Sequence, residues 1–261
     1  MLPAQTIAAL AAELSRAHRE RTVLPRITAR HPEATVEDSY AIARVWRDER
    51  LESGRRLVGR KIGLTSKAMQ SATGITEPDY GVIFDDTVWP TGSVVPFDDF
   101  SNVRIEVELA FLLAAPLQGP HCSLFDVLQA TQYVVPALEI LNSHIELPGR
   151  TIVDTIADNA AYGGIVLGGN PTRPDAVDLR WISALLYRNE TIEESGVAAA
   201  VLNHPASGVA WLANKLHQHG DRLEAGELIL AGSFTRPMWV SRGDTVLCDY
   251  GPMGTITCRF E

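Results

Sequence analysis

The chain has 261 residues, of which 46% are hydrophobic and 21% charged, an ordinary globular composition with enough residues for a sizeable core. Lys and Arg number 23 against 32 for Asp and Glu, which gives a formal net charge of −9. This acidic balance argues against nucleic acid as a partner, because a phosphate-binding surface needs an excess of basic residues. It does not exclude an anionic small molecule, because a local site can carry the opposite charge.

Several common protein classes are excluded by what the sequence lacks. The longest apolar stretches are well short of the roughly 20 residues that a membrane span needs, so no membrane association is expected. Three scattered cysteines, Cys122, Cys248 and Cys258, are too few for a disulfide framework or a thiolate metal site, which favours the reducing cytoplasm. P-loop, G-x-G-x-x-G and G-x-S-x-G motifs are absent, which argues against the commonest nucleotide-binding and hydrolase classes.

The beginning of the chain is predicted to be helical. Apolar residues recur at helical spacing from Ile7 to Leu14, in a segment that ends near Arg21. A second helix is predicted to begin at Thr35, a capping residue with an acidic residue three positions later, and to end near Gly54. We therefore expect residues 1–56 to form an N-terminal helical segment.

The remainder is predicted to consist mainly of strands. Gly, Pro and Asp separate β-rich runs at 57–64, 81–84, 103–113, 164–167, 179–187, 227–231, 245–250 and 255–260. Two helices, at 124–131 and 203–219, interrupt this series. Strands without regular βαβ alternation predict the α+β class with a curled mixed β-sheet over residues 57–261, as one structural unit with the N-terminal helices.

The run at 103–113 carries two carboxylates. Side chains alternate between the two faces of a strand, so Glu106 and Glu108 are expected on one face, about 7 Å apart along the backbone. Neighbouring carboxylates repel each other unless water, a proton or a cation neutralises them. The pair therefore indicates either a solvated acidic face or a cation site.

Glu139 favours the cation site. It lies between the apolar run 133–138 and two further aliphatic residues, so we expect it to be buried, and an unpaired buried carboxylate costs several kcal/mol. Three carboxylates without a histidine or a thiolate form an all-oxygen site, which suits Mg²⁺ or Mn²⁺ better than Zn²⁺. A salt bridge from Glu139 to Arg104 is the alternative, and the spacing does not decide between them.

Three shorter segments are further candidates. Lys61 lies in an apolar run flanked by glycines, so it is either a buried lysine with a depressed pKa or a surface residue of an edge strand. Asp79 is either part of a site or a turn residue. The hydroxyl-rich turn that begins at Gly232 and includes Ser233 and Thr235 has N–H and hydroxyl groups for a carboxylate.

Two histidines are weaker candidates. His204 precedes a proline and is interpreted as a helix-start residue rather than a catalytic base. His144 is close to Glu139 in sequence, so it either lines the same site or lies in a loop.

Together, these segments resemble the fumarylacetoacetate hydrolase superfamily, in its hydratase and decarboxylase branch. The resemblance extends from about residue 37 to residue 260, and within the branch it is strongest to the enzymes that hydrate 2-oxo-hept-4-ene-1,7-dioate. The matching segments are residues 59–69, 77–81, 104–111, 136–139, 158–160 and 232–235.

The resemblance implies a mixed β-roll that forms the catalytic domain over residues 57–261, and a homo-oligomer, either a pentamer or a decamer. It assigns Glu106, Glu108 and Glu139 as ligands of a divalent metal ion, Mg²⁺ or Mn²⁺. Lys61 and Asp79 match the proton-transferring catalytic residues. The substrate-binding residues predicted on this basis are Thr235, Ser233, Leu64 and Arg236, the last as our first choice for a second carboxylate.

The reaction implied is the metal-dependent addition of water to a 2-hydroxy-2,4-dienoate or its 2-oxo-enoate tautomer, in the catabolism of aromatic compounds. The expected substrate is an anionic small molecule, 2-oxo-hept-4-ene-1,7-dioate of the homoprotocatechuate pathway, which would yield 4-hydroxy-2-oxoheptanedioate. The segment 140–150 is closer in length to that of 2-oxopent-4-enoate hydratases. Those hydratases usually carry a serine at about the position of Ala161, however, and this chain lacks it. The alternatives are therefore such a hydratase, a vinylogous 2-oxo-acid decarboxylase resembling 4-oxalocrotonate decarboxylase, an acylpyruvate hydrolase, or an inactive structural subunit.

Overall fold

The computed structural model describes residues 1–261, except for the side chains of Ala68, Ala72 and Thr73. The helices are α1 Ala4–Glu20, α2 Ile27–Arg30, α3 Val36–Glu52, α4 Lys67–Thr73, α5 Leu124–Ala130, α6 Ile152–Ala157 and α7 Pro205–His217. The strands are β1 Leu57–Gly63, β2 Asp79–Phe84, β3 Val88–Pro90, β4 Ser93–Val95, β5 Val103–Leu113, β6 Thr131–Asn142, β7 Tyr162–Leu167, β8 Ser183–Arg188, β9 Thr191–Val197, β10 Leu228–Leu230, β11 Met238–Trp239, β12 Thr245–Asp249 and β13 Thr255–Phe260.

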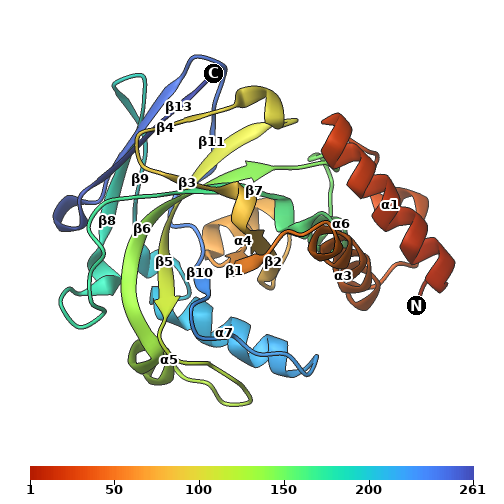
Figure 1. The fold of residues 1–261 in the computed structure, drawn as a ribbon, viewed down its shortest axis with the longest axis horizontal. Coiled ribbons are helices and arrows are strands. Elements are labelled where there is room, and N and C mark those ends of the chain that lie inside the picture. The colour runs from red at the N-terminus through yellow and green to blue at the C-terminus, as the bar shows by residue number, and fades with distance from the viewer.

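Two curled β-sheets make up the main body (Figure 1). The larger sheet has eight strands in the order β2-β1-β10-β5-β6-β7-β3, with β11 paired to β5, and the smaller has five in the order β4-β13-β12-β8-β9. Both contain parallel and antiparallel pairs, since β1 pairs in parallel with β10 and β4 with β13. This architecture confirms the predicted α+β class with a curled mixed sheet.

The N-terminal helices pack against each other and against the main body. α1 buries Leu10 and Leu14, which lie at helical spacing. α3 begins with the predicted capping box, in which the Thr35 side chain accepts a hydrogen bond from the N–H three residues later. The first two helices share a small core with α3, Ile145 and Ala157. Figure 1 shows α1 and α3 on one side of the sheets, next to α6.

The main hydrophobic core determines which face of β5 is available for chemistry. Val107, Leu109 and Phe111 of β5 are fully buried in this core together with Ile256 and Phe260 of β13. Because side chains alternate along a strand, the even-numbered residues of β5 project from its other face, where Arg104 and Glu106 line the cavity described below. None of the helices in the described part of the chain combines the length and the hydropathy of a bilayer-spanning helix.

Candidate active site

Three glutamates meet on two adjacent central strands. In the antiparallel register of β5 and β6, Glu106 lies directly opposite Glu139, and Glu108 follows two residues later on the face of Glu106. One carboxylate oxygen from each residue lies within 4.8 Å of those from the other two. The structure therefore brings together all three residues that were predicted as metal ligands.

Burial makes this cluster electrostatically costly without a cation. Glu108 and Glu139 are completely buried, and Glu106 is partly exposed. Burial, reinforced by the Glu139 carboxylate, raises the pKa of Glu106 to about 7. Burial likewise raises the pKa of Glu108, again with the charge of Glu139 as the next cause, and burial raises the pKa of Glu139 despite the nearby Lys61 ammonium. The three side chains are fully ionised together only if additional positive charge is present.

The unpaired oxygens of the cluster fit a divalent metal ion. The Gly232 N–H donates to Glu108 Oε2 at 2.8 Å, whereas Glu108 Oε1 and Glu139 Oε2 have no hydrogen-bond partner in the described part of the molecule. Buried carboxylate oxygens without partners are unfavourable, and coordination would satisfy them. The donors are all oxygen, which is the preference of Mg²⁺ and Mn²⁺.

Lys61 is the ion-pair partner of Glu139, for which the sequence left open either a salt bridge to Arg104 or a metal ion. Its Nζ lies 3.0 Å from Glu139 Oε1, so the ion pair of Glu139 is with Lys61 and not with Arg104. Lys61 is only 2% exposed. Burial alone would lower the pKa of Lys61, but the carboxylates of Glu139 and Asp79 outweigh it and raise this pKa above its ordinary value. The predicted depressed pKa is therefore wrong for the metal-free site, because the lysine is buried among carboxylates.

Asp79 and Lys61 converge over a glycine. Asp79 is the first residue of β2 and pairs with Gly63 of β1. A Cβ at Gly63 would lie 2.2 Å from Asp79 Oδ1 and 3.5 Å from Lys61 Nζ, so any other residue here would displace the Asp79 carboxylate. Burial raises the pKa of Asp79, against the lowering effect of Lys61, and neither of its carboxylate oxygens has a hydrogen-bond partner among the described residues.

Leu64 and Thr235, two of the predicted substrate-binding residues, lie at or near the carboxylate cluster. Leu64 lines a cavity of about 60 Å³ together with Lys61, Asp79 and Glu106. Thr235 is buried beside β5, where its Oγ1 accepts a hydrogen bond from the N–H of Val107.

Ser233 and Arg236, which were predicted to bind the substrate, contact other residues of this chain instead. The Ser233 hydroxyl donates to the carbonyl of Thr235 at 3.0 Å and accepts from the Thr235 N–H, so it stabilises the turn. Arg236 is not brought into the cavity: its side chain is 76% exposed and pairs with Glu194 at 3.0 Å. The expectation that Arg236 meets a second carboxylate is not supported within this chain, because the turn directs its side chain outward.

Two arginines that the sequence did not assign to the site line the cavity instead. These are Arg104 on β5 and Arg150 in the loop between β6 and α6. Burial, followed by the charge of Arg150, lowers the pKa of Arg104 to about 10. Arg104 had a usable signal, because it lies two residues before Glu106 and therefore on the same strand face. Arg150 had none, since a loop residue has no periodicity.

A left-handed turn forms another wall of the cavity. Asn159, Ala160 and Ala161 have φ values of 49°, 53° and 59°, a conformation that non-glycine residues adopt rarely and at an energetic cost. The Asn159 side chain holds this turn against β2, accepting from the Val82 N–H at 2.8 Å and donating to the Val82 carbonyl at 2.9 Å. Ala160 and Ala161 thereby reach the cavity that contains Lys61.

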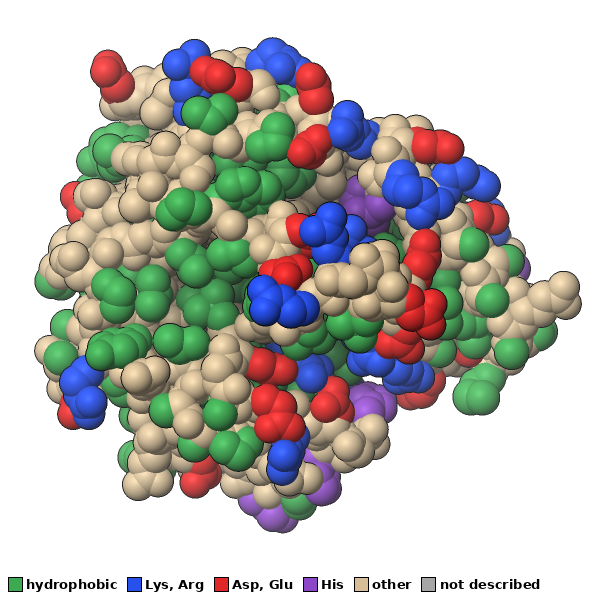
Figure 2. Space-filling model, viewed as in Figure 1, with side chains coloured by type: hydrophobic (Ala, Val, Ile, Leu, Met, Phe, Trp, Pro, Cys, Tyr) green, Lys and Arg blue, Asp and Glu red, His purple; other side chains and the backbone are tan. Residues whose placement is uncertain are grey.

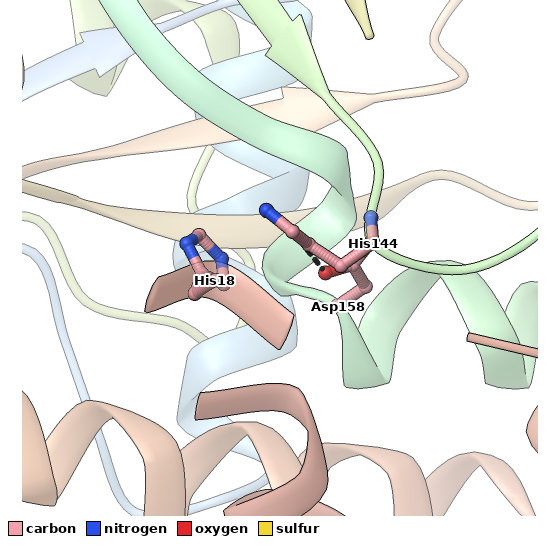
Figure 3. A group of neighbouring side chains, drawn as sticks. All are labelled: His18, His144 and Asp158. Carbon is pink, nitrogen blue, oxygen red and sulfur yellow. Dashed lines mark hydrogen bonds and ion pairs between the residues drawn. The ribbon is translucent and has the colours of Figure 1, made fainter. Parts of the chain in front are cut away.

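Figure 3 shows a second group of potential ligands, His18, His144 and Asp158. None of the three lines the cavity of Lys61 and Glu106. The rings of His18 and His144 lie against each other with their centroids 3.6 Å apart and their planes tilted by 30°. His144 Nδ1 lies 3.0 Å from Asp158 Oδ1, and its Nε2 contacts the Asn142 amide at 3.2 Å. The group joins α1 to the main body. His204, as predicted, caps α7 and accepts from a backbone N–H.

Comparisons with known proteins agree with this geometry. The chain is 54% identical to the 2-oxo-hept-4-ene-1,7-dioate hydratase of Escherichia coli over 267 aligned positions, which cover 100% of both chains. It is 39% identical to the 2-keto-4-pentenoate hydratase of Paraburkholderia xenovorans over 230 residues, 88% of this chain and 86% of the relative. No family model matches the chain.

A solved structure has nearly the same backbone. The 4-oxalocrotonate decarboxylase of Pseudomonas putida G7, complexed with magnesium and adipate, superposes with a TM-score of 0.97 at 34% identity. The match covers 100% of this chain and 99% of the decarboxylase.

Proposed function

Because this chain belongs to the hydratase and decarboxylase branch of the fumarylacetoacetate hydrolase superfamily, we propose that it hydrates 2-oxo-hept-4-ene-1,7-dioate to 4-hydroxy-2-oxoheptanedioate. The observation that carries the reaction type is the cluster of Glu106, Glu108 and Glu139 beside Lys61, at a cavity that Glu106 and Lys61 line. The full-length similarity to a hydratase of this dioate supports the choice of substrate.

Glu106, Glu108 and Glu139 would hold a divalent metal ion, as their unpaired oxygens and raised pKa values favour. We propose Mg²⁺, with Mn²⁺ as the alternative, because both prefer oxygen ligands. When bound, the ion supplies Lewis acidity toward the carboxylate and the 2-oxo group at one end of the substrate.

The chain's own residues supply charge and proton transfer. The Lys61 ammonium, held beside Glu139 at 3.0 Å, would stabilise negative charge that develops on the C2 oxygen. Asp79 has a raised pKa, which brings it nearer to the pH at which a carboxyl exchanges protons efficiently, and it would take a proton from water or return one to carbon. Overall, one O–H bond of water breaks, the oxygen bonds to C4 of the substrate, and the proton is transferred to the carbon chain.

Decarboxylation of a 2-oxo dioate is the second candidate, because the backbone superposes on 4-oxalocrotonate decarboxylase with a TM-score of 0.97. The two reactions need the same charge stabilisation at the C2 oxygen. They differ in the product: hydration adds the mass of water, whereas decarboxylation releases CO₂.

We propose further that the chain acts as a homo-oligomer, a pentamer or a decamer, in the cytoplasm. Large apolar side chains are exposed near and on the smaller sheet, including Trp181 (63%), Ile192 (51%) and Leu185 (38%). Figure 2 shows hydrophobic side chains gathered over the strand-rich half of the molecule, and the charged side chains mostly over the other half. Exposed apolar patches of this kind mark protein interfaces. Cys122, Cys248 and Cys258 are free thiols, which suits a reducing compartment.

One assay tests the proposed function. Purified protein with Mg²⁺ is given 2-hydroxyhepta-2,4-dienedioate, and loss of the dienoate ultraviolet absorbance is followed together with the product mass and CO₂ release. The expected result is a product heavier than the substrate by one water, formed only with a divalent metal ion. Release of CO₂ would assign the decarboxylase activity instead, and no turnover with any divalent ion would contradict both.

A further inference from the structure

Two arginine side chains line the candidate active site without a carboxylate partner. Arg104, which is 7% exposed, and Arg150 line the cavity that also contains Lys61 and Glu106. Both donate hydrogen bonds to the Ser143 hydroxyl, from Arg104 Nη2 at 2.8 Å and from Arg150 Nη1 at 2.9 Å. Two positive charges therefore share one neutral acceptor.

This arginine pair, Arg104 and Arg150, makes no direct ion pair within the described part of the chain, although the carboxylate of Glu106 is near enough to act on the charge of Arg104. No carboxylate among the described side chains forms an ion pair with either guanidinium, and the buried Nε of Arg104 has no hydrogen-bond partner there. The Trp239 ring lies 5.3 Å from the guanidinium carbon of Arg104 and supports it through a cation–π contact. Because a buried cation without a counter-ion is unfavourable, the pair indicates a place for an anion supplied by a ligand.

The arginine pair and the carboxylate cluster lie at different points along one row of β5. Arg104, Glu106 and Glu108 project from the same face, each about 7 Å from the next along the strand. Leu141 lies opposite Arg104 as Glu139 lies opposite Glu106, and Leu141 also lines the cavity. An extended seven-carbon chain separates its terminal carboxylate carbons by roughly 7–8 Å, which is comparable to this spacing.

We propose that Arg104 and Arg150 bind the distal carboxylate of the substrate, at C7, and thereby select seven-carbon dioates over five-carbon monocarboxylates. This inference rests on the proposed function, which directs the C1 end of the substrate to the three glutamates. Arg104 Nε is buried without a hydrogen-bond partner among the described residues, and planar guanidinium groups bind carboxylates through paired hydrogen bonds. Arg150 would add a second charge from the loop.

A kinetic comparison tests this assignment. The values of kcat/KM for 2-hydroxyhepta-2,4-dienedioate and 2-hydroxypenta-2,4-dienoate are measured at saturating Mg²⁺ for the wild type, Arg104→Gln, Arg104→Lys and Arg150→Gln. The control is Arg173→Gln, because Arg173 is exposed and pairs only with Asp175 at the surface in the described structure. We expect the dioate-to-monocarboxylate ratio to fall at least about tenfold in both glutamine variants, since a charge-assisted hydrogen bond contributes about 10- to 150-fold. Arg104→Lys should retain part of the ratio, and Arg173→Gln all of it.

A binding experiment separates recognition from turnover. Isothermal titration compares adipate, a six-carbon dicarboxylate, with hexanoate, which has the same length and one carboxylate. We expect the wild type to bind adipate at least about tenfold more tightly than hexanoate, and we expect Arg150→Gln to lose this difference. If Arg104→Gln fails to fold by circular dichroism, Arg150→Gln decides the question, because Arg150 lies in a loop and is less buried.

The outcomes distinguish this inference from the proposed function. A wild-type dioate preference that persists in Arg150→Gln, in both assays, would overturn the inference. Equal losses on both substrates, with the adipate preference intact, would also overturn it and make the arginines structural. Adipate selectivity that depends on Arg150, in a protein that hydrates neither dienoate, would support the arginine subsite and contradict the proposed function.

Discussion

Glu106, Glu108 and Glu139 differ in how their negative charge is balanced without metal. Glu139 has the Lys61 ammonium at 3.0 Å, Glu108 has the Gly232 N–H at 2.8 Å, and Glu106 is partly exposed. None of these partners offsets the burial of the carboxylates, which is the largest cause of the raised pKa values of all three. Each residue should therefore be needed for metal affinity.

We expect Glu106→Gln and Glu139→Gln to weaken Mg²⁺ or Mn²⁺ binding at least about 100-fold while leaving the protein folded. An amide is nearly isosteric with a carboxylate but removes a negative ligand, and even changes outside the ligand shell commonly cost 10- to 100-fold in metal affinity. Isothermal titration with Mn²⁺ measures this, with the exposed Glu33→Gln as the control. Wild-type affinity in both variants would reject the three-carboxylate assignment.

Lys61→Met should lower kcat by about 30- to 1000-fold at saturating Mg²⁺, without loss of metal affinity. The ammonium stabilises charge that develops during the reaction, and removal of such a donor commonly costs about 2–4 kcal/mol in the transition state. The buried carboxylates lose a competing cation in this variant, so metal binding should be maintained. If the metal-saturated rate were unchanged and metal binding lost, Lys61 would be a structural support for the glutamates.

The sequence predicted the glutamate cluster but not the arginine pair. Alternation along a strand was enough to put Glu106 and Glu108 on one face, and the apolar context of Glu139 indicated burial. The pairing of Glu106 with Glu139 depends on strand register, which only the folded sheet reveals. Arg150 comes from a loop with no periodicity, and the outward direction of Arg236 depends on the geometry of its turn.

At the level of elements, predictions succeeded where a local signal was strong. The capping pattern at Thr35 and the alternation in residues 103–113 correspond to α3 and β5. β6 was missed because Pro136 is unusual in a central strand, and β9 because its sequence lacks an apolar alternation. α6 was missed although the capping box between Thr151 and Asp154 was a readable signal.

The junction of α1 with the main body should depend on pH through His18. Burial lowers the pKa of His18, reinforced by the charges of His144 and Arg50, so folding favours the neutral form of His18. Its unfolded form gains a proton below about pH 6.5, so stability falls as the pH drops through that value. In Mg²⁺-saturated protein, the melting temperature of His18→Phe should therefore fall less between pH 7.5 and 5.5 than that of the wild type. An identical fall in both proteins would show that His18 does not couple α1 to pH.

For the whole molecule, removal of the metal ion should make the folded state less stable as the pH rises, the opposite direction to the effect of His18. The pKa of Glu106 is about 7 in the folded metal-free protein, against an ordinary value of 4.5, so the folded state binds more protons between these values. Stability is then greatest at the acidic end and is lost as the pH rises through about 7. In EDTA, the melting temperature should fall between pH 5 and pH 8, less so in Glu106→Gln, and Mg²⁺ should restore it at pH 8. A melting temperature at pH 8 that does not respond to Mg²⁺ would contradict this linkage.

The chemistry proposed for this chain depends on Glu106, Glu108 and Glu139 holding a divalent metal ion. A crystal structure of the protein grown with Mn²⁺, with an anomalous difference map, tests this most directly. We expect one strong peak about 2.1 Å from a carboxylate oxygen of each of the three glutamates. A map without a peak there, or with its main peak among His18, His144 and Asp158, would contradict it.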